Sequence, residues 1–269
     1  QWDPTGQFID AGKEICWAEK RQNIPRWDHQ TGDVCRHHEE ADEQRLVLDA
    51  CPRYYSTSHM RRIVEKHPDA HFVVLIRDPI ARLESHLNDN VRHNNYRKAS
   101  TAEKLLQNVL KAKRGRPVEI HLSEYGGNLL NALLVIPPSR MLIVRSESLS
   151  SNAQEITDAV MRHFGYNGTK LVQPNVANNG RGVMHSKYQH FTGKVREALE
   201  NYFSLDAEVL FELVGKRFPW PWLERGGAED WAITKPVLDA AKTIELRKRY
   251  SDLVEPAMKR ILDTLTPQK

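Results

Sequence analysis

Residues 71–85, with the sequence HFVVLIRDPIARLES, constrain the fold of this chain more than any other segment. The run 72–76 is continuously apolar and rich in β-branched residues, which is typical of a strand covered on both faces of a parallel sheet. Asp78 follows where an N-cap belongs and Pro79 where the first helical residue belongs, so the pattern predicts a helix immediately after the strand. The spacing of apolar residues gives that helix one stripe, formed by Ile80, Leu83, Leu87 and Val91.

Arg77 and Ser85 make this strand–helix junction a candidate anion site. Arg77 is the first residue after the strand, and Ser85 lies off the apolar stripe of the helix. A guanidinium at the carboxyl edge of a sheet, beside free backbone N–H groups and a hydroxyl, can bind phosphate. The alternative is a purely structural helix cap with Arg77 bonded to an acidic neighbour, and the local chemistry favours neither.

The composition is that of a globular protein with anionic partners. The chain has 269 residues, of which 40% are hydrophobic and 28% charged, and its formal net charge is +4. One α/β domain of this length can bury a substantial core. We expect no membrane span and no signal peptide in these residues, because they contain no apolar run of the required length. Nucleic acid ranks last among the anionic partners, since no basic–aromatic recognition motif occurs.

The cysteines do not suggest a metal site. Cys16, Cys35 and Cys51 lack the spacing of metal ligands. A Cys16–Cys35 disulfide, in an oxidising compartment, and free buried thiols both remain open.

Strand and helix patterns alternate along the chain, which predicts βαβ units and a parallel sheet. The expected strands are 45–48, 72–76 and 141–144. Helices are expected at 56–66, from Pro79, and at 101–113, 118–135, 152–164 (closed by Gly165), 190–203 and 206–214, with one or two more within 234–265. We expect a polar functional loop at 166–190, an aromatic cluster packed on the core at 218–222 and a flexible connection at 224–233. The simplest description is one domain, 1–269, with a core at about 13–222 and a helical C-terminal extension at about 223–269.

The segment Arg77-Asp78-Pro79-x-x-Arg82-x-x-Ser85 resembles the 3′-phosphate-binding segment of sulfotransferases that use 3′-phosphoadenosine 5′-phosphosulfate (PAPS). Five further segments resemble elements of the heparan-type carbohydrate sulfotransferases in the same chain order: 13–17, 49–54, 125–129, 141–149 and 180–185. The resemblance implies an α/β fold with a parallel sheet flanked by helices, the P-loop-like sulfotransferase fold.

The resemblance also implies a reaction, the transfer of a sulfuryl group from PAPS to a hydroxyl or amine of a carbohydrate or other polar acceptor. Glu14 corresponds to the general base, and Lys13 would meet the sulfonate or an anionic acceptor. The residues implied to bind the nucleotide are Arg77, Ser85, Arg181 and Gly182. No metal is implied. The expected location is the Golgi lumen or secretory pathway, with the cytoplasm as the alternative.

Two features of the sequence keep a second hypothesis open. The family's Gly-rich, Lys-containing loop for the 5′-phosphosulfate has no counterpart in these 269 residues, and Ala50 stands where a lysine is expected. The alternative is a non-catalytic nucleotide-binding or interaction module on the same scaffold. A P-loop nucleotide kinase is disfavoured because no G-x-x-x-x-G-K-[ST] motif is present.

Overall fold

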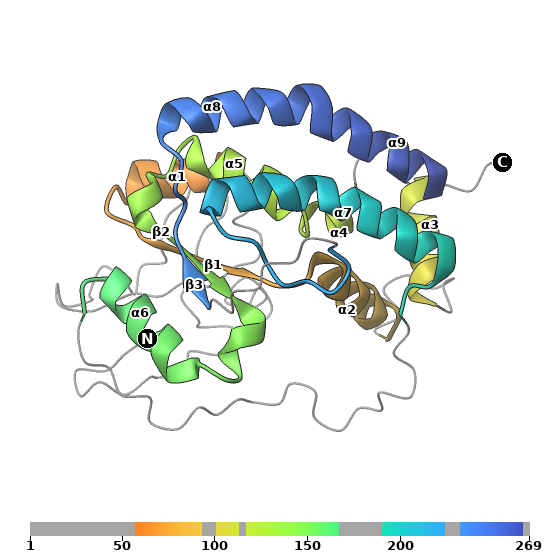
Figure 1. Ribbon diagram of the computed structural model, residues 1–269, viewed down its shortest axis with the longest axis horizontal. Helices are drawn as coiled ribbons and strands as arrows, with labels where there is room; N and C mark the ends of the chain where they lie inside the picture. The colour runs from red at the N-terminus through yellow and green to blue at the C-terminus, as the bar shows by residue number, and fades with distance from the viewer. Residues whose placement is uncertain (1–56, 93–100, 113–116, 167–189, 224–231, 266–269) are drawn as a thin grey trace, which may run out of the picture.

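The computed structural model describes residues 57–92, 101–112, 117–166, 190–223 and 232–265. Within them the elements follow in the order α1 (Thr57–Lys66), β1 (Phe72–Ile76), α2 (Pro79–Arg92), α3 (Ala102–Ala112), α4 (Val118–His121), α5 (Tyr125–Leu133), β2 (Met141–Arg145), α6 (Ala153–His163), α7 (Gly193–Val214), β3 (Ile233–Thr234), α8 (Ala240–Arg249) and α9 (Glu255–Leu265) (Figure 1). Short 3₁₀ segments flank β2, at Pro138–Arg140 and Ser146–Leu149, and a π-helical segment, η7 (Tyr250–Val254), joins α8 to α9. The protein is therefore of mixed α/β type.

The described sheet has the order β1-β2-β3. Strands β1 and β2 are parallel and in register from Phe72↔Met141 to Ile76↔Arg145, which confirms the predicted parallel pairing. The strand predicted at 45–48 lies outside the described residues.

The prediction that 224–233 is only a connection is wrong at its end, because β3 pairs antiparallel with β2 through Ile143↔Thr234. The Ala232 carbonyl extends this pairing by accepting the N–H of Arg145 at 2.9 Å. Two residues are too short for an alternation that a sequence pattern could reveal.

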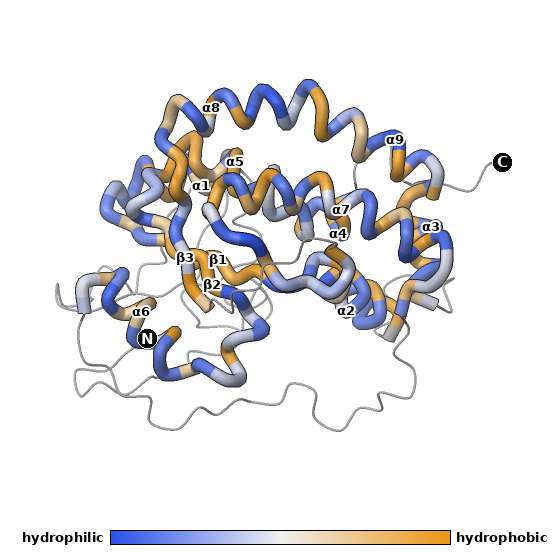
Figure 2. The backbone as a smooth tube through the Cα atoms, viewed as in Figure 1, coloured by the Kyte–Doolittle hydropathy of each residue, from blue (hydrophilic) through white to orange (hydrophobic). Residues whose placement is uncertain are grey.

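Helices cover both faces of the sheet. Helix α6 lies on the opposite side from α5, α7 and α8 (Figure 1). Because side chains alternate along a strand, β2 sends Met141 and Ile143 into the main core and Leu142 and Val144 into a smaller cluster. In Figure 2, β1 and β2 form a hydrophobic centre, whereas α8 at the surface is largely hydrophilic.

Strand β1 departs from the expected burial on both faces. Val74 and Ile76 are buried, but Leu75 is 55% exposed. The apolar run therefore predicted the strand correctly, but the side chain of Leu75 is not covered as the run suggested.

Helix α2 forms as its sequence predicts. It begins at Pro79 and continues to Arg92. Ile80, Leu83 and Leu87 are fully buried in the main core, so the apolar stripe is the face that fixes this helix on the sheet.

Several helix boundaries differ from the predicted ones. The apolar stretch 118–135 contains two helices, because the chain turns at 122–124 between α4 and α5. The two helices predicted at 190–203 and 206–214 are one, α7, of 22 residues. Gly165 adopts φ +86° just beyond α6, as its expected role in closing that helix requires.

The aromatic cluster after α7 packs on the core as predicted. Phe218 and Trp220 are buried and stack with ring centroids 4.8 Å apart, and Trp222 stacks on Trp220 at 5.6 Å. This column leads from α7 to the start of α2, where Trp222 makes a polar contact described below.

Candidate functional site

The ends of β1 and β2 meet at one edge of the sheet, since the strands are parallel. Arg77 follows β1 directly, and Glu147 lies two residues beyond the end of β2. The backbone N–H of Asp78 donates to Glu147 Oε1 at 2.7 Å, which ties the two strand ends together. The edge therefore carries a cation and a carboxylate on adjacent backbones, as ligand sites at sheet edges often do.

Arg77 is half-buried at this edge. Within the described part of the chain, its guanidinium has no hydrogen-bond or ion-pair partner, so the acidic partner that a structural role would require is not observed there. A half-buried guanidinium with open donors fits the phosphate group that the sequence predicts at this position.

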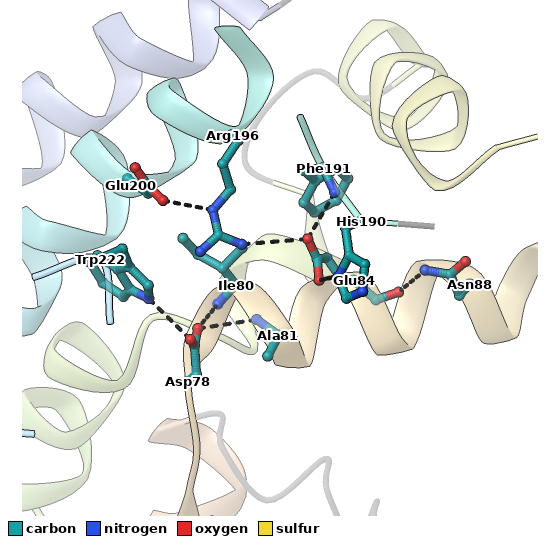
Figure 3. A network of polar contacts seen from close by, with 10 residues as sticks. All are labelled: Asp78, Ile80, Ala81, Glu84, Asn88, His190, Phe191, Arg196, Glu200 and Trp222. Atoms are coloured by element: carbon teal, nitrogen blue, oxygen red, sulfur yellow. Dashed lines mark hydrogen bonds and ion pairs between the residues drawn. The ribbon is translucent and has the colours of Figure 1, made fainter. Parts of the chain in front are cut away.

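The start of α2 differs from the prediction in one respect. Asp78 is the cap, as expected: its Oδ1 accepts the N–H groups of Ile80 at 2.8 Å and Ala81 at 3.1 Å (Figure 3). These two N–H groups are therefore not free for a ligand. The other carboxylate oxygen, Oδ2, accepts the indole N–H of Trp222 at 3.1 Å. From this strand–helix unit, an anion can therefore be bound by Arg77 and by hydroxyl groups, but not by these two amides.

Ser85 lies two turns along α2 and is half-buried. Residues seven positions apart share a helix face, so Ser85 lies on the same face as Asp78, about 10 Å further along the axis. Arg77 and Ser85 thus belong to a single strand–helix unit, eight positions apart in the chain.

Glu84, which the sequence did not single out, fixes the middle of α2 to the start of α7. It is buried, and its Oε1 accepts the N–H of Phe191 at 2.8 Å while Oε2 contacts His190 Nδ1 at 2.9 Å (Figure 3). The guanidinium of Arg196 lies 3.5 Å from Oε1. The residues that follow the predicted polar loop are therefore anchored one position away from Ser85.

Tyr125, the first residue of α5, lies behind Arg77. It is only 3% exposed, and the charged groups that act on its hydroxyl include Arg82 and Arg77. Burial raises the pKa of Tyr125 to about 12, and the charges of Arg82 and Arg77 oppose that rise. The Tyr125 hydroxyl is therefore uncharged at neutral pH, although Arg82, Arg77 and Glu147 act on it electrostatically.

A buried carboxylate, Asp206 of α7, caps the start of α5. Its Oδ2 accepts the N–H of Gly126 and its Oδ1 accepts the N–H of Gly127, both at 2.9 Å, and Tyr250 donates to Oδ1 at 3.1 Å. Complete burial raises the pKa of Asp206 to about 7, and the nearby charge of Glu124 adds to the effect.

This raised pKa predicts how stability depends on pH. The folded protein holds a proton on Asp206 at pH values where the unfolded chain has lost it, so the free energy of unfolding should fall as pH rises from about 4 to about 7. Asp206→Asn should remove the contribution of Asp206 to this pH dependence of the free energy of unfolding, whatever its effect on absolute stability. Urea unfolding at about pH 5 and about pH 8 measures the slope. The exposed Asp263→Asn should keep it, and an unchanged slope in Asp206→Asn would contradict the assignment.

Four of the six predicted site residues are not described by the structure. Lys13 and Glu14 lie in 1–56, and Arg181 and Gly182 lie in 167–189. The three cysteines also fall outside the described residues. Among the described residues, no group of three His, Cys, Asp or Glu side chains could hold a metal ion, and none of the helices has the length and apolarity to cross a membrane.

The residues that the sequence reasoning missed are Glu84, Asp206 and Glu147, while Tyr125 was seen only as part of a motif. Each of the three carboxylates accepts a backbone N–H from a residue at least 69 positions away in the chain. No local pattern carries that information. For Glu84 and Asp206, the one available signal was that an acidic residue occupies a core-facing helix position, where an unpaired charge would be costly.

With this geometry established, comparison with known proteins identifies the fold. The chain is similar to the crystal structure of a sulfotransferase from Alicyclobacillus acidocaldarius, with a TM-score of 0.55 over 67% of this chain and 69% of that chain. The two sequences are 17% identical across this match. No family model matches the sequence, and no curated protein matches it either. The likeness therefore shows a sulfotransferase fold and leaves the reaction to be argued from the site.

Proposed function

We propose that this protein is a PAPS-dependent sulfotransferase, which moves a sulfuryl group from PAPS to a hydroxyl or amine of a polar acceptor. The observation that carries the proposal is the half-buried Arg77 at the carboxyl end of β1, followed along α2 by Ser85. Among the described residues, the Arg77 guanidinium has no hydrogen-bond or ion-pair partner. The fold likeness to a solved sulfotransferase supports it. Following the resemblance in the sequence, we extend the proposal to a carbohydrate acceptor and to the heparan type.

In this proposal Arg77 and Ser85 hold the 3′-phosphate of the nucleotide. Arg77 contributes charge-assisted hydrogen bonds and Ser85 contributes its hydroxyl. Arg181 and Gly182 would close over the nucleotide phosphates from the segment that ends at His190. His190 and Phe191, the first described residues after 167–189, are bonded to Glu84, which precedes Ser85 on α2.

The chemical step requires positioning and proton removal. In-line transfer of the sulfuryl group to the acceptor oxygen breaks the bond between sulfur and the bridging oxygen, by analogy with phosphoryl transfer. Glu14 would take the acceptor proton, and Lys13 would offset negative charge on the sulfonate or the acceptor. Both assignments follow from the sequence resemblance.

Replacing the proposed base tests the catalytic assignment. Glu14→Gln should lower the sulfation rate by about 10²- to 10⁴-fold and leave the affinity for adenosine 3′,5′-bisphosphate (PAP) unchanged, because only the proton acceptor is lost. Transfer of radiolabelled sulfate from PAPS to a panel of oligosaccharides gives the rate. Glu19→Gln, five positions along the same segment, is the matched control and should retain activity. A normal rate in Glu14→Gln would remove Glu14 from the mechanism.

A non-catalytic nucleotide-binding module is the second candidate. Ala50, which stands where the resembling segment has a lysine, favours it, since a cation facing the sulfonate is then missing. This candidate predicts tight binding of PAP with no transfer to any acceptor of the panel.

A further inference from the structure

The carboxylate of Asp78 is the nearest in sequence to the proposed phosphate ligand, because Asp78 directly follows Arg77. Both of its oxygens accept hydrogen bonds from N–H groups (Figure 3). Oδ1 accepts the backbone N–H groups of Ile80 and Ala81, and Oδ2 accepts the indole N–H of Trp222 at 3.1 Å. Asp78 is therefore bonded to the start of α2 and to an indole rather than to the guanidinium beside it.

Glu147, a second carboxylate at this edge of the sheet, is also bonded to a backbone group. Its Oε1 accepts the N–H of Asp78 at 2.7 Å. Among the described residues, the Arg77 guanidinium makes no hydrogen bond or ion pair with either acid. Carboxylates are strong partners for a guanidinium, so their engagement by N–H groups leaves the charge of Arg77 available to an anion from outside the protein.

The indole that binds Asp78 is held in place by an aromatic stack. The ring of Trp222 lies on that of Trp220, with 5.6 Å between the centroids and 18° between the planes, and Trp220 stacks on Phe218 at 4.8 Å. Trp220 and Phe218 are buried in the main core. The core therefore fixes the direction in which the indole N–H of Trp222 points.

The role of this N–H follows from what Oδ2 of Asp78 would do without it. A carboxylate oxygen that loses its donor at a half-buried position is costly to leave unsatisfied. The guanidinium of the preceding residue, Arg77, carries donors that can satisfy it. A bond from Arg77 to Oδ2 would then compete with a phosphate for the same donors.

We propose that Trp222 is a positioning residue for the 3′-phosphate site, in which its indole N–H holds the Asp78 carboxylate away from Arg77 and so leaves the guanidinium open to the phosphate. This inference rests on the proposed function. Trp222 acts through Asp78 and needs no contact with the nucleotide. Its effect is specific to the 3′-phosphate, because Arg77 is the group that the released carboxylate would occupy.

The expected effect of Trp222→Phe is a loss of discrimination between two nucleotides. The variant keeps an aromatic ring in the stack and removes the N–H, so the affinity for PAP should fall by about 3- to 10-fold. The affinity for adenosine 5′-monophosphate, which lacks the 3′-phosphate, should stay the same. Isothermal titration calorimetry with each nucleotide gives the ratio of the two dissociation constants.

Asp78→Asn supplies the background that tests how Trp222 acts. The amide oxygen of the variant can still accept the N–H groups of Ile80 and Ala81, but no carboxylate remains to pair with Arg77. Trp222→Phe should therefore lower the preference for PAP in the wild-type background and leave it unchanged in the Asp78→Asn background. Equal losses in the two backgrounds would show that Trp222 does not act through Asp78.

Trp220→Phe is the matched control within the same stack. The indole N–H of Trp220 has no hydrogen-bond partner in the described part of the chain, so this variant loses the same atoms without releasing Asp78. Urea unfolding should show a loss of stability in both tryptophan variants, whereas only Trp222→Phe should lose preference for PAP.

An unchanged preference in Trp222→Phe, or an equal loss in Trp220→Phe, would overturn the positioning role while leaving the proposed function intact. A wild-type protein that binds the two nucleotides equally would instead overturn the proposed function, and this inference with it.

Discussion

Arg77→Ala is expected to weaken binding of PAP by about 10- to 150-fold, since hydrogen bonds to a charged group contribute about 1.5–3 kcal/mol. The variant should also lose most of the thermal stabilisation that PAP gives to the wild-type protein. The free energy of unfolding without ligand should change little, because the guanidinium makes no hydrogen bond or ion pair within the described residues. Calorimetric titration and a melting curve with and without PAP measure both quantities.

Arg162→Ala is the charge-matched control for this experiment. Arg162 is exposed on α6, on the far side of the sheet from α5 and α7, and its removal changes the net charge by the same amount. Its affinity for PAP should remain close to that of the wild-type protein. A comparable loss in both variants would mean that the effect is general electrostatics and that Arg77 is not a specific ligand.

Glu84→Ala should lower the free energy of unfolding by about 3 kcal/mol, because it leaves the buried N–H of Phe191 without its acceptor and Arg196 without a buried partner. Glu84 is 2% exposed, so water cannot replace the lost carboxylate. Urea unfolding followed by circular dichroism measures this change.

Glu200→Ala is a direct comparison, since Glu200 pairs with the same arginine at 2.7 Å (Figure 3). Glu200 is partly exposed and four residues from Arg196 on the same helix, so its loss should cost less than about 1 kcal/mol. Equal losses in the two variants would contradict the view that Glu84 anchors α7 to α2.

The parts of the fold that local chemistry determines could be predicted from the sequence. The Asp78-Pro79 pair fixes the start of α2, since a cap side chain and a fixed φ act within three residues. Strands β1 and β2 follow from continuous apolar runs, and the position of Arg77 follows from where the first run stops.

Features of the fold that depend on contacts between residues far apart in the chain could not be predicted from local sequence patterns. Asp206 accepts the N–H groups of Gly126 and Gly127 at the start of α5, which lie 80 and 79 positions earlier in the chain. Strand β3 is defined by its pairing with β2, which is also distant in the chain. The break expected between 203 and 206 is absent, because α7 continues through Ser204 with Phe203 and Ala207 buried in the core on either side. The Ser204 hydroxyl bonds back to the Asn201 carbonyl within the helix.

The central claim is that the edge formed by β1 and α2 binds the 3′-phosphate of a nucleotide. Calorimetric titration of the wild-type protein with PAP, and separately with adenosine 5′-monophosphate, tests it most directly. We expect PAP to bind at least about tenfold more tightly than adenosine 5′-monophosphate, as one additional charge-assisted contact requires. Equal affinities for the two nucleotides, or no binding of PAP, would contradict it.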